Sequence, residues 1–195
     1  MHFYKRLGNA IREKVLDAYA GLSSEKRRGS CLPVAFDGLV RGALEPSVYR
    51  EHLERGQPNG ANQLPSIVIT VEAAFNRSFF GRADYYTSSQ SLSSDIGLGG
   101  RTGPLCREGA EEVVRRIRRG NGNFGVLVAV CGTTRREGHI SSLISGGKGT
   151  IISVDGGKRC LTRCLSNREA VLILRQAQAK GRGLVIEVGR IRGEE

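Results

Sequence analysis

Cysteine and histidine side chains are the first candidates for chemistry in this chain, which has five cysteines and three histidines. Cys131 follows an apolar run and precedes His139 by eight residues, the best pairing of a thiol with an imidazole that the sequence offers. A thiol beside a general base can act as a nucleophile. Cysteine is far more often a small core residue, so a thiol enzyme is only a secondary alternative.

A metal site would have to come from the same residues, namely Cys106, Cys131, His139, Cys160 and Cys164. Cys160 and Cys164 fall within one expected strand, where four residues of separation put the two side chains on one face but about 13 Å apart. One zinc ion cannot bind both thiols at that distance. The sequence therefore predicts no metal site and no cofactor.

Two carboxylates and two glycine-rich stretches complete the candidates for chemistry. Glu187 and Asp155 lie in strand-like contexts, without the clustered carboxylates and lysine of a metal-dependent nuclease. Residues 97–103 resemble a dinucleotide fingerprint, but the third glycine comes one place late. Residues 146–150 lack the first glycine of a phosphate-binding loop and suit a hairpin tip. No catalytic residue is assigned, and the sequence favours a non-enzymatic protein over a nuclease or thiol enzyme.

An arginine-rich helix followed by an apolar strand is the clearest structural unit. Between Glu108 and Arg119, four apolar residues recur with helical spacing and should form one buried face: Ala110, Val113, Val114 and Ile117. Gly120 ends this helix. The run from Phe124 to Cys131 has no polar side chain before its last residue and suits a strand covered on both faces.

The other elements follow from periodicity, capping residues and turns. Helices are expected at Phe3–Ala20, at Val48–Arg55 after a Ser47 cap, and at Asn167–Lys180, where Ser166 and Glu169 form a capping box. Leu32–Leu44 is interrupted by proline and glycine and reads as a short strand or irregular segment. Strands are expected at 66–75, 140–145, 150–154, 158–165 and 184–191.

These elements predict an α+β fold, with a largely antiparallel sheet and two to three helices packed on one face. The alternative is an open α/β sheet, in which the helix at 108–119 crosses over between the strands at 67–75 and 124–131. The 195 residues should form a single domain, 1–195, with an N-terminal helical subregion, 1–55, before a core at 66–195.

The compartment is predicted from cysteine usage and from the lack of long apolar runs. No run approaches the roughly 18 residues of a membrane span, and the N-terminus has no secretory signal. Five cysteines without framework spacing suit reduced thiols, so no structural disulfide is expected. The predicted location is the cytoplasm, or the host cytoplasm or nucleus for a viral protein.

Charge is the most informative global property. Thirty basic residues against nineteen acidic ones give a net charge of +11, with 24 arginines to 6 lysines. A guanidinium group binds phosphate through two parallel hydrogen bonds, and a net positive charge attracts polyanions. The primary prediction is therefore a non-enzymatic protein that binds the phosphate backbone of RNA or DNA.

Specific surfaces are assigned to each binding function. The nucleic-acid contacts are predicted at Arg115, Arg116, Arg118, Arg119, Arg135, Arg136, Lys148, Lys158, Arg159 and Arg163, with Tyr85 and Tyr86 stacking on bases. The alternative is a viral matrix-like assembly protein that binds a nucleocapsid or forms homo-oligomers. Its basic N-terminal face would lie on an anionic membrane through Lys5, Arg6, Arg12 and Lys14. No small-molecule substrate is indicated.

Overall fold

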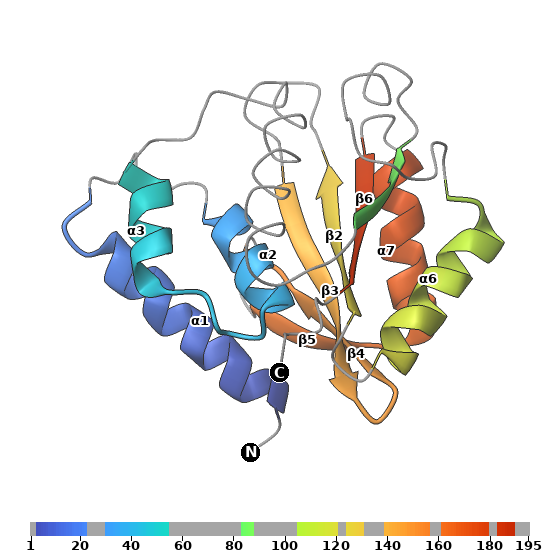
Figure 1. Cartoon of the computed structure of the whole chain (residues 1–195), viewed down its shortest axis with the longest axis horizontal. Coiled ribbons are helices and arrows are strands. Elements are labelled where there is room, and N and C mark those ends of the chain that lie inside the picture. Colours follow the sequence, from blue (N-terminus) through green and yellow to red (C-terminus); the bar gives the residue numbers. More distant parts are fainter. Residues whose placement is uncertain are drawn as a thin grey trace.

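The computed structural model describes residues 3–22, 30–54, 83–87, 105–120, 124–130, 139–156, 161–179 and 183–189. Six strands of these residues form one antiparallel sheet in the order β1-β6-β2-β3-β4-β5 (Figure 1). Their bounds are β1 (Ala83–Thr87), β2 (Phe124–Val130), β3 (His139–Gly147), β4 (Thr150–Val154), β5 (Thr162–Leu165) and β6 (Gly183–Gly189). The predicted α+β class with an antiparallel sheet is confirmed.

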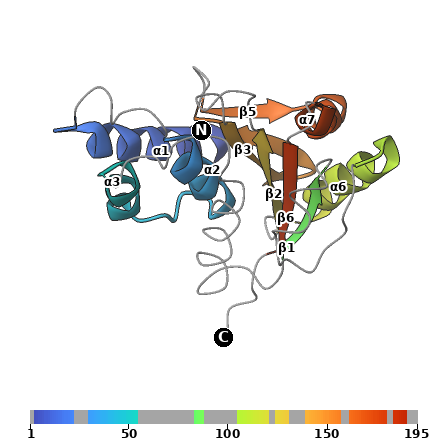
Figure 2. The ribbon, with the colours of Figure 1, turned by 90° about the horizontal axis from the view of Figure 1, so that it is seen from above.

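Helices cover both faces of this sheet. The described helices are α1 (Phe3–Tyr19), α2 (Cys31–Leu39), α3 (Pro46–Glu54), α6 (Arg107–Arg119) and α7 (Asn167–Ala179). Figure 2 shows α1, α2 and α3 on one side of the sheet and α6 and α7 on the other. The prediction that the helices pack on one face is therefore wrong. No described helix has both the length and the apolar composition needed to cross a membrane.

The sheet separates two hydrophobic clusters, and successive residues of one strand belong to different clusters. Leu127 on β2 packs in the cluster beneath α1, α2 and α3, whereas Val126 and Val128 pack in the cluster beneath α6 and α7. This division follows from the two-residue period of a strand. All three residues are at most 3% exposed, which confirms that β2 is covered on both faces, as its apolar sequence predicted.

Helix α2 lies where the sequence predicted a short strand or irregular segment at Leu32–Leu44, and that prediction is wrong. Seven of its nine residues are buried, so no polar face gives the sequence a helical period. Pro33 lies in the first turn, where its missing N–H breaks no helical hydrogen bond. Gly38 lets the helix approach the sheet, because a side-chain carbon at this position would lie 2.5 Å from Ser142 Oγ.

Most of the other predicted elements that fall on described residues are confirmed. They include the helices α1, α3, α6 and α7, the hairpin of β3 and β4, and the strand β6. The predicted strand at 66–75 lies outside the described residues, and so does the crossover that the open α/β alternative required.

Candidate active site

Helix α2 begins at Cys31, and the side chain of its N-cap residue, Ser30, does not cap the first turn. The Tyr19 hydroxyl donates a hydrogen bond to Ser30 Oγ at 2.8 Å, and the Ser30 side chain makes no capping hydrogen bond to the helix. The amides of Cys31 and Leu32 donate to no acceptor among the described residues. Since a helix N-terminus carries partial positive charge and unpaired N–H groups, this end of α2 favours a nearby anion.

A buried ion pair fixes α2 against its neighbouring helices. Lys14 on α1 donates to Asp37 Oδ2 at 2.9 Å, and the Asp37 side chain is fully buried. Asp37 also accepts hydrogen bonds from the Leu44 amide and the Tyr49 hydroxyl, each at 2.9 Å. Burial and the adjacent Asp37 carboxylate raise the pKa of Tyr49, so its hydroxyl remains a donor. The network joins α1, α2 and α3 around one carboxylate.

The loop after β4 approaches the start of α2 closely. A side-chain carbon placed on Gly156 would lie 3.2 Å from Cys31 Cα and 3.3 Å from Val34 Cβ. Asp155 comes directly before this glycine and directly after β4. Close packing of the two backbones therefore holds Asp155 beside the first turn of α2.

His139, the first residue of β3, lies between Asp155 and Cys31. Its Nε2 lies 2.7 Å from Asp155 Oδ1, and its ring also interacts with the Cys31 thiol, which raises the pKa of the ring. The hydrogen bond to Asp155 and then that to Cys31 raise the pKa of His139 to about 9, against the opposing effect of burial. At neutral pH the ring is therefore an imidazolium.

The thiol, imidazole and carboxylate thus meet from three segments that are far apart in the sequence. Cys31 is partly exposed, the His139 side chain is 39% exposed and the Asp155 side chain is 15% exposed. A nucleophile, a base that can reach it and a third group that orients the base are the parts that nucleophilic catalysis requires. The site is open enough for a substrate to reach the sulfur and the ring.

The sequence identified one member of this site but gave it the wrong partner. It paired His139 with Cys131, which lies outside the described residues, whereas the structure brings His139 to Cys31. The sequence suggested a chemical role for Asp155 only as a carboxylate of a metal-dependent nuclease. A usable signal was present at residues 30–39, where a serine precedes a cysteine and an apolar run, as at a helix start.

The predicted arginine surface is only partly a free surface. Arg115 is exposed and pairs with Glu112, and Arg118 is exposed and donates through Nε to Gly149 O at 2.9 Å. Arg119 is exposed as well. Arg116 instead turns toward the sheet, where it pairs with the buried Glu187 of β6. The expectation that all four side chains point outward is wrong for Arg116.

The remaining predicted nucleic-acid residues are scattered or undescribed. Lys148 lies in the turn between β3 and β4, as the predicted hairpin tip requires, and Arg163 on β5 pairs with Glu169 at 3.3 Å. Tyr85 and Tyr86 lie on β1, which pairs with β6. Four more lie outside the described residues: Arg135, Arg136, Lys158 and Arg159.

The predicted membrane face on α1 loses one of its four members. Lys5, Arg6 and Arg12 are exposed. Lys14 is 15% exposed and bonds to Asp37 and to the carbonyl oxygens of Gly42 and Leu44. Its ammonium group therefore stabilises the helical layer and faces away from the surface that the prediction required.

The cysteines of the described residues are free thiols. Cys31, Cys106 and Cys164 form no disulfide, whereas Cys131 and Cys160 lie outside the described part of the chain. Within that part, no group of three or more histidine, cysteine, aspartate or glutamate side chains could hold a metal ion.

Comparisons with known proteins add little to this geometry. No family model matches the chain, and no curated protein matches it in sequence. Among solved structures, the crystal structure of the Pseudomonas avirulence protein AvrPphB is similar, with a TM-score of 0.41 and 10% identity over 90% of this chain and 98% of that one. A likeness of this extent says nothing about function, which must come from the residues of the site.

Proposed function

We propose that this protein is a cysteine hydrolase that cleaves an acyl bond, an amide or an ester, through a thioester intermediate on Cys31. The observation that carries this proposal is the meeting of His139 with both the Asp155 carboxylate, at 2.7 Å, and the Cys31 thiol at the start of α2. His139 serves as the acid and base, and Asp155 orients its ring. The proposal replaces a non-enzymatic binder as the primary function.

Acylation begins with the sulfur of Cys31. The positively charged ring of His139 and the N-terminus of α2, with its partial positive charge, both lie beside this sulfur. The thiolate attacks the carbonyl carbon, and the negative charge that develops on the carbonyl oxygen is stabilised by the amides of Cys31 and Leu32, which donate to no acceptor among the described residues. The His139 imidazolium then donates its proton to the leaving amine or alcohol, and the carbon–sulfur bond of the thioester remains.

Deacylation uses the same residues in reverse. His139, now neutral, takes a proton from water, and the resulting hydroxide attacks the thioester carbon. The carboxylic acid product leaves, and Cys31 returns to the thiolate beside an imidazolium. Throughout, the hydrogen bond from Nε2 to Asp155 orients and stabilises the charged ring.

A thiol nucleophile works only in its reduced form, so the proposed reaction requires a cellular compartment that keeps thiols reduced. The proposed chemistry therefore fits a reducing environment such as the cytoplasm, where the reduced cysteines of the sequence prediction would also persist. Oxidation of Cys31 to a sulfenic acid would stop the reaction until a thiol reductant restored it.

A generic activated ester tests the proposal without knowledge of the natural substrate. With p-nitrophenyl acetate, the wild-type protein should release a rapid burst of nitrophenolate as the thioester forms, followed by slower turnover. Mass spectrometry of the quenched protein should place the acetyl group on Cys31. The Cys31→Ala variant should lose the burst, because no other described thiol has an imidazole beside it.

Cys106→Ala is the matched control, because Cys106 is a more exposed thiol at the start of another helix. It should keep the full burst. A burst that survives in Cys31→Ala, or an acetyl group found mainly on another residue, would overturn the assignment of Cys31 as the nucleophile.

A further inference from the structure

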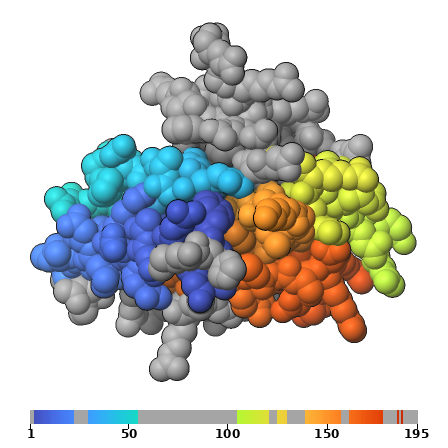
Figure 3. Space-filling model, turned by 90° about the horizontal axis from the view of Figure 1, so that it is seen from below, coloured from blue at the N-terminus to red at the C-terminus, as the bar shows by residue number. Residues whose placement is uncertain are grey.

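A basic groove lies on the face of the sheet opposite Cys31, between α6 and α7. Its volume is about 750 Å³. Figure 3 shows the two helices side by side at the surface of the molecule. The groove is lined by five arginines, one carboxylate, one amide and three apolar side chains: Arg107, Arg115, Arg118, Arg168, Arg175, Glu111, Asn167, Val114, Val171 and Leu172.

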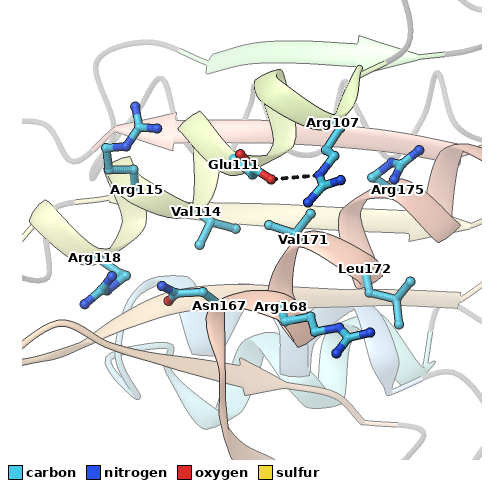
Figure 4. A pocket seen from close by; sticks show the side chains of 10 residues that line it. All are labelled: Arg107, Glu111, Val114, Arg115, Arg118, Asn167, Arg168, Val171, Leu172 and Arg175. Carbon is cyan, nitrogen blue, oxygen red and sulfur yellow. Dashed lines mark hydrogen bonds and ion pairs between the residues drawn. The ribbon is translucent and has the colours of Figure 1, made fainter.

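The arginines stand at both ends of the groove and on both walls. Figure 4 shows Arg107 of α6 near Arg175 of α7 at one end and Arg118 of α6 at the other, with Asn167 between Arg118 and Arg168 and with the Arg168 side chain pointing away from Arg118, below Leu172. Arg107 and Arg118 are eleven residues apart on α6, which corresponds to about 16 Å of helix. Between the two ends, Val114 and Val171 form an apolar floor. The groove is thus an elongated channel with cationic walls.

The positive charge of the groove is only partly neutralised from within. Arg107 pairs with Glu111 at 3.0 Å, and Arg115 pairs with Glu112. Arg118, Arg168 and Arg175 are exposed, and Arg175 interacts electrostatically with the Glu108 carboxylate. The N-terminus of α7 adds partial positive charge beside Arg168. Arg118 uses only its Nε in the bond to Gly149 O, and Arg168 and Arg175 are exposed, so each guanidinium group can still donate to an anionic ligand.

We propose that this groove binds the phosphate backbone of single-stranded nucleic acid. Guanidinium groups suit phosphate because their planar array of donors can form two parallel hydrogen bonds with its oxygens. A strand supplies one negative charge per nucleotide, so phosphates a few nucleotides apart can reach Arg118 at one end and Arg175 at the other. Sugars and bases would lie over Val114, Val171 and Leu172, of which Leu172 is 52% exposed.

The shape of the site favours a strand over the other large anions. A bilayer surface is broad and cannot enter a channel between two helices, whereas a single strand can lie along it. A net charge of +11 over the chain attracts a long polyanion. A positively charged groove that follows the backbone is also what sequence-tolerant strand binding uses.

The hairpin of β3 and β4 extends the cationic surface beyond the α6 end of the groove. Arg118 bonds to Gly149 O in this turn, and Lys148 is the preceding residue. Lys148 has φ of 49°, in the left-handed region between glycines at 147 and 149. This conformation keeps the tip of the hairpin tight next to Arg118, so a strand leaving the groove would pass Lys148.

The test uses a short fluorescein-labelled oligouridine and fluorescence anisotropy, with the full chain at several salt concentrations. Arg168→Gln and Arg175→Gln together should weaken binding at least about tenfold at low salt. The slope of log K against log salt should become shallower by about 1.4, since each lost contact on a single strand contributes roughly 0.7. Stability should hardly change, because both residues are exposed.

The matched control is Arg6→Gln with Arg12→Gln, which removes the same charge from exposed positions on the opposite face. This variant should keep most of the affinity and nearly the full slope. Equal losses in the two variants would mean that only net charge matters and would overturn the proposal.

Two competitors decide the class of ligand. A polyglutamate peptide and vesicles containing phosphatidylserine should displace the oligouridine poorly from the wild-type protein. Displacement by either one at the same concentration of charge would overturn the assignment to nucleic acid, in favour of an acidic peptide or a membrane. Binding by Cys31→Ala should equal that of the wild-type protein, so this result does not depend on whether the protein is a hydrolase.

Discussion

Two of the helices that the structure describes start at a cysteine, and they lie on opposite faces of the same sheet. Cys31 is the first residue of α2, and Cys106 is the N-cap of α6. The Cys106 sulfur accepts a hydrogen bond from the Gly109 amide at 3.3 Å, and its thiol interacts with the Glu108 carboxylate. Cys31 instead lies beside the imidazole of His139.

The comparison shows that a helix N-terminus alone does not make a nucleophile. Both sulfurs lie where the helix favours negative charge, but at Cys106 the sulfur caps its own helix and has a carboxylate next to it. A thiolate there would face a like charge, whereas at Cys31 it would face an imidazolium. The more exposed thiol should therefore be the less reactive one.

The largest expected effect comes from removing the carboxylate of Asp155, which contacts the imidazole beside Cys31. Asp155→Asn should lower the rate of ester or amide hydrolysis by up to about 10⁴-fold, because the amide can hold His139 in the wrong tautomer. Steady-state kinetics and the nitrophenolate burst measure this loss. A variant that retains the wild-type rate would show that Asp155 does not orient the ring.

The next effect is a difference in thiol alkylation. With limiting iodoacetamide at pH 7, Cys31 should react at least about tenfold faster than Cys106, because an imidazolium lies beside the Cys31 sulfur and a carboxylate beside the Cys106 sulfur. Peptide mapping by mass spectrometry gives both rates in one sample. In His139→Ala the two rates should converge, and an advantage of Cys31 that persisted without His139 would contradict the assigned role of the imidazole.

A smaller effect is expected on the pH dependence of stability. The pKa of His139 is raised from 6.5 to about 9 in the folded protein, so folding favours the protonated ring. This contribution is fully present below pH 6.5 and is lost as the pH rises through about 9. The melting temperature should fall over this range, and less so in Asp155→Asn. Parallel curves for the two proteins would rule out this ion pair as a source of stability.

The smallest expected effect concerns Glu108, the carboxylate beside Cys106. Glu108→Gln removes the carboxylate beside Cys106 and should raise the alkylation rate of Cys106 at pH 7 by less than about fivefold, since the pair is exposed. Cys31 in the same sample serves as the internal control. A large increase, approaching the rate of Cys31, would mean that a helix N-terminus suffices after all.

Local chemistry made much of the fold predictable. The capping box at the start of α7 is present: the Ser166 amide donates to Glu169 Oε2 at 2.8 Å, and the Glu169 amide donates to Ser166 Oγ at 3.3 Å. The apolar stripe of α6 is buried, and Ile117 in it is fully so. Each of these features depends on residues within one or two turns of each other, so the sequence pattern contains them.

The site could not be predicted from local sequence patterns in this way, because its residues come together only in the tertiary structure. Cys31 begins a helix that has no polar face, and His139 and Asp155 reach it only after β3 and β4 pair across the sheet. No local spacing connects these residues. The insertion of β6 between β1 and β2 is a further long-range feature without a local signal.

The carboxylate of Asp37 has a consequence for how this protein can evolve. Loss of Lys14 alone would leave a buried charge without its counterion, a change that typically costs about 3 to 5 kcal/mol. Replacement of the whole network by well-packed apolar residues can be neutral. Relatives of this chain should therefore carry Lys14, Asp37 and Tyr49 together or lack all three, and intermediate combinations should be rare among them.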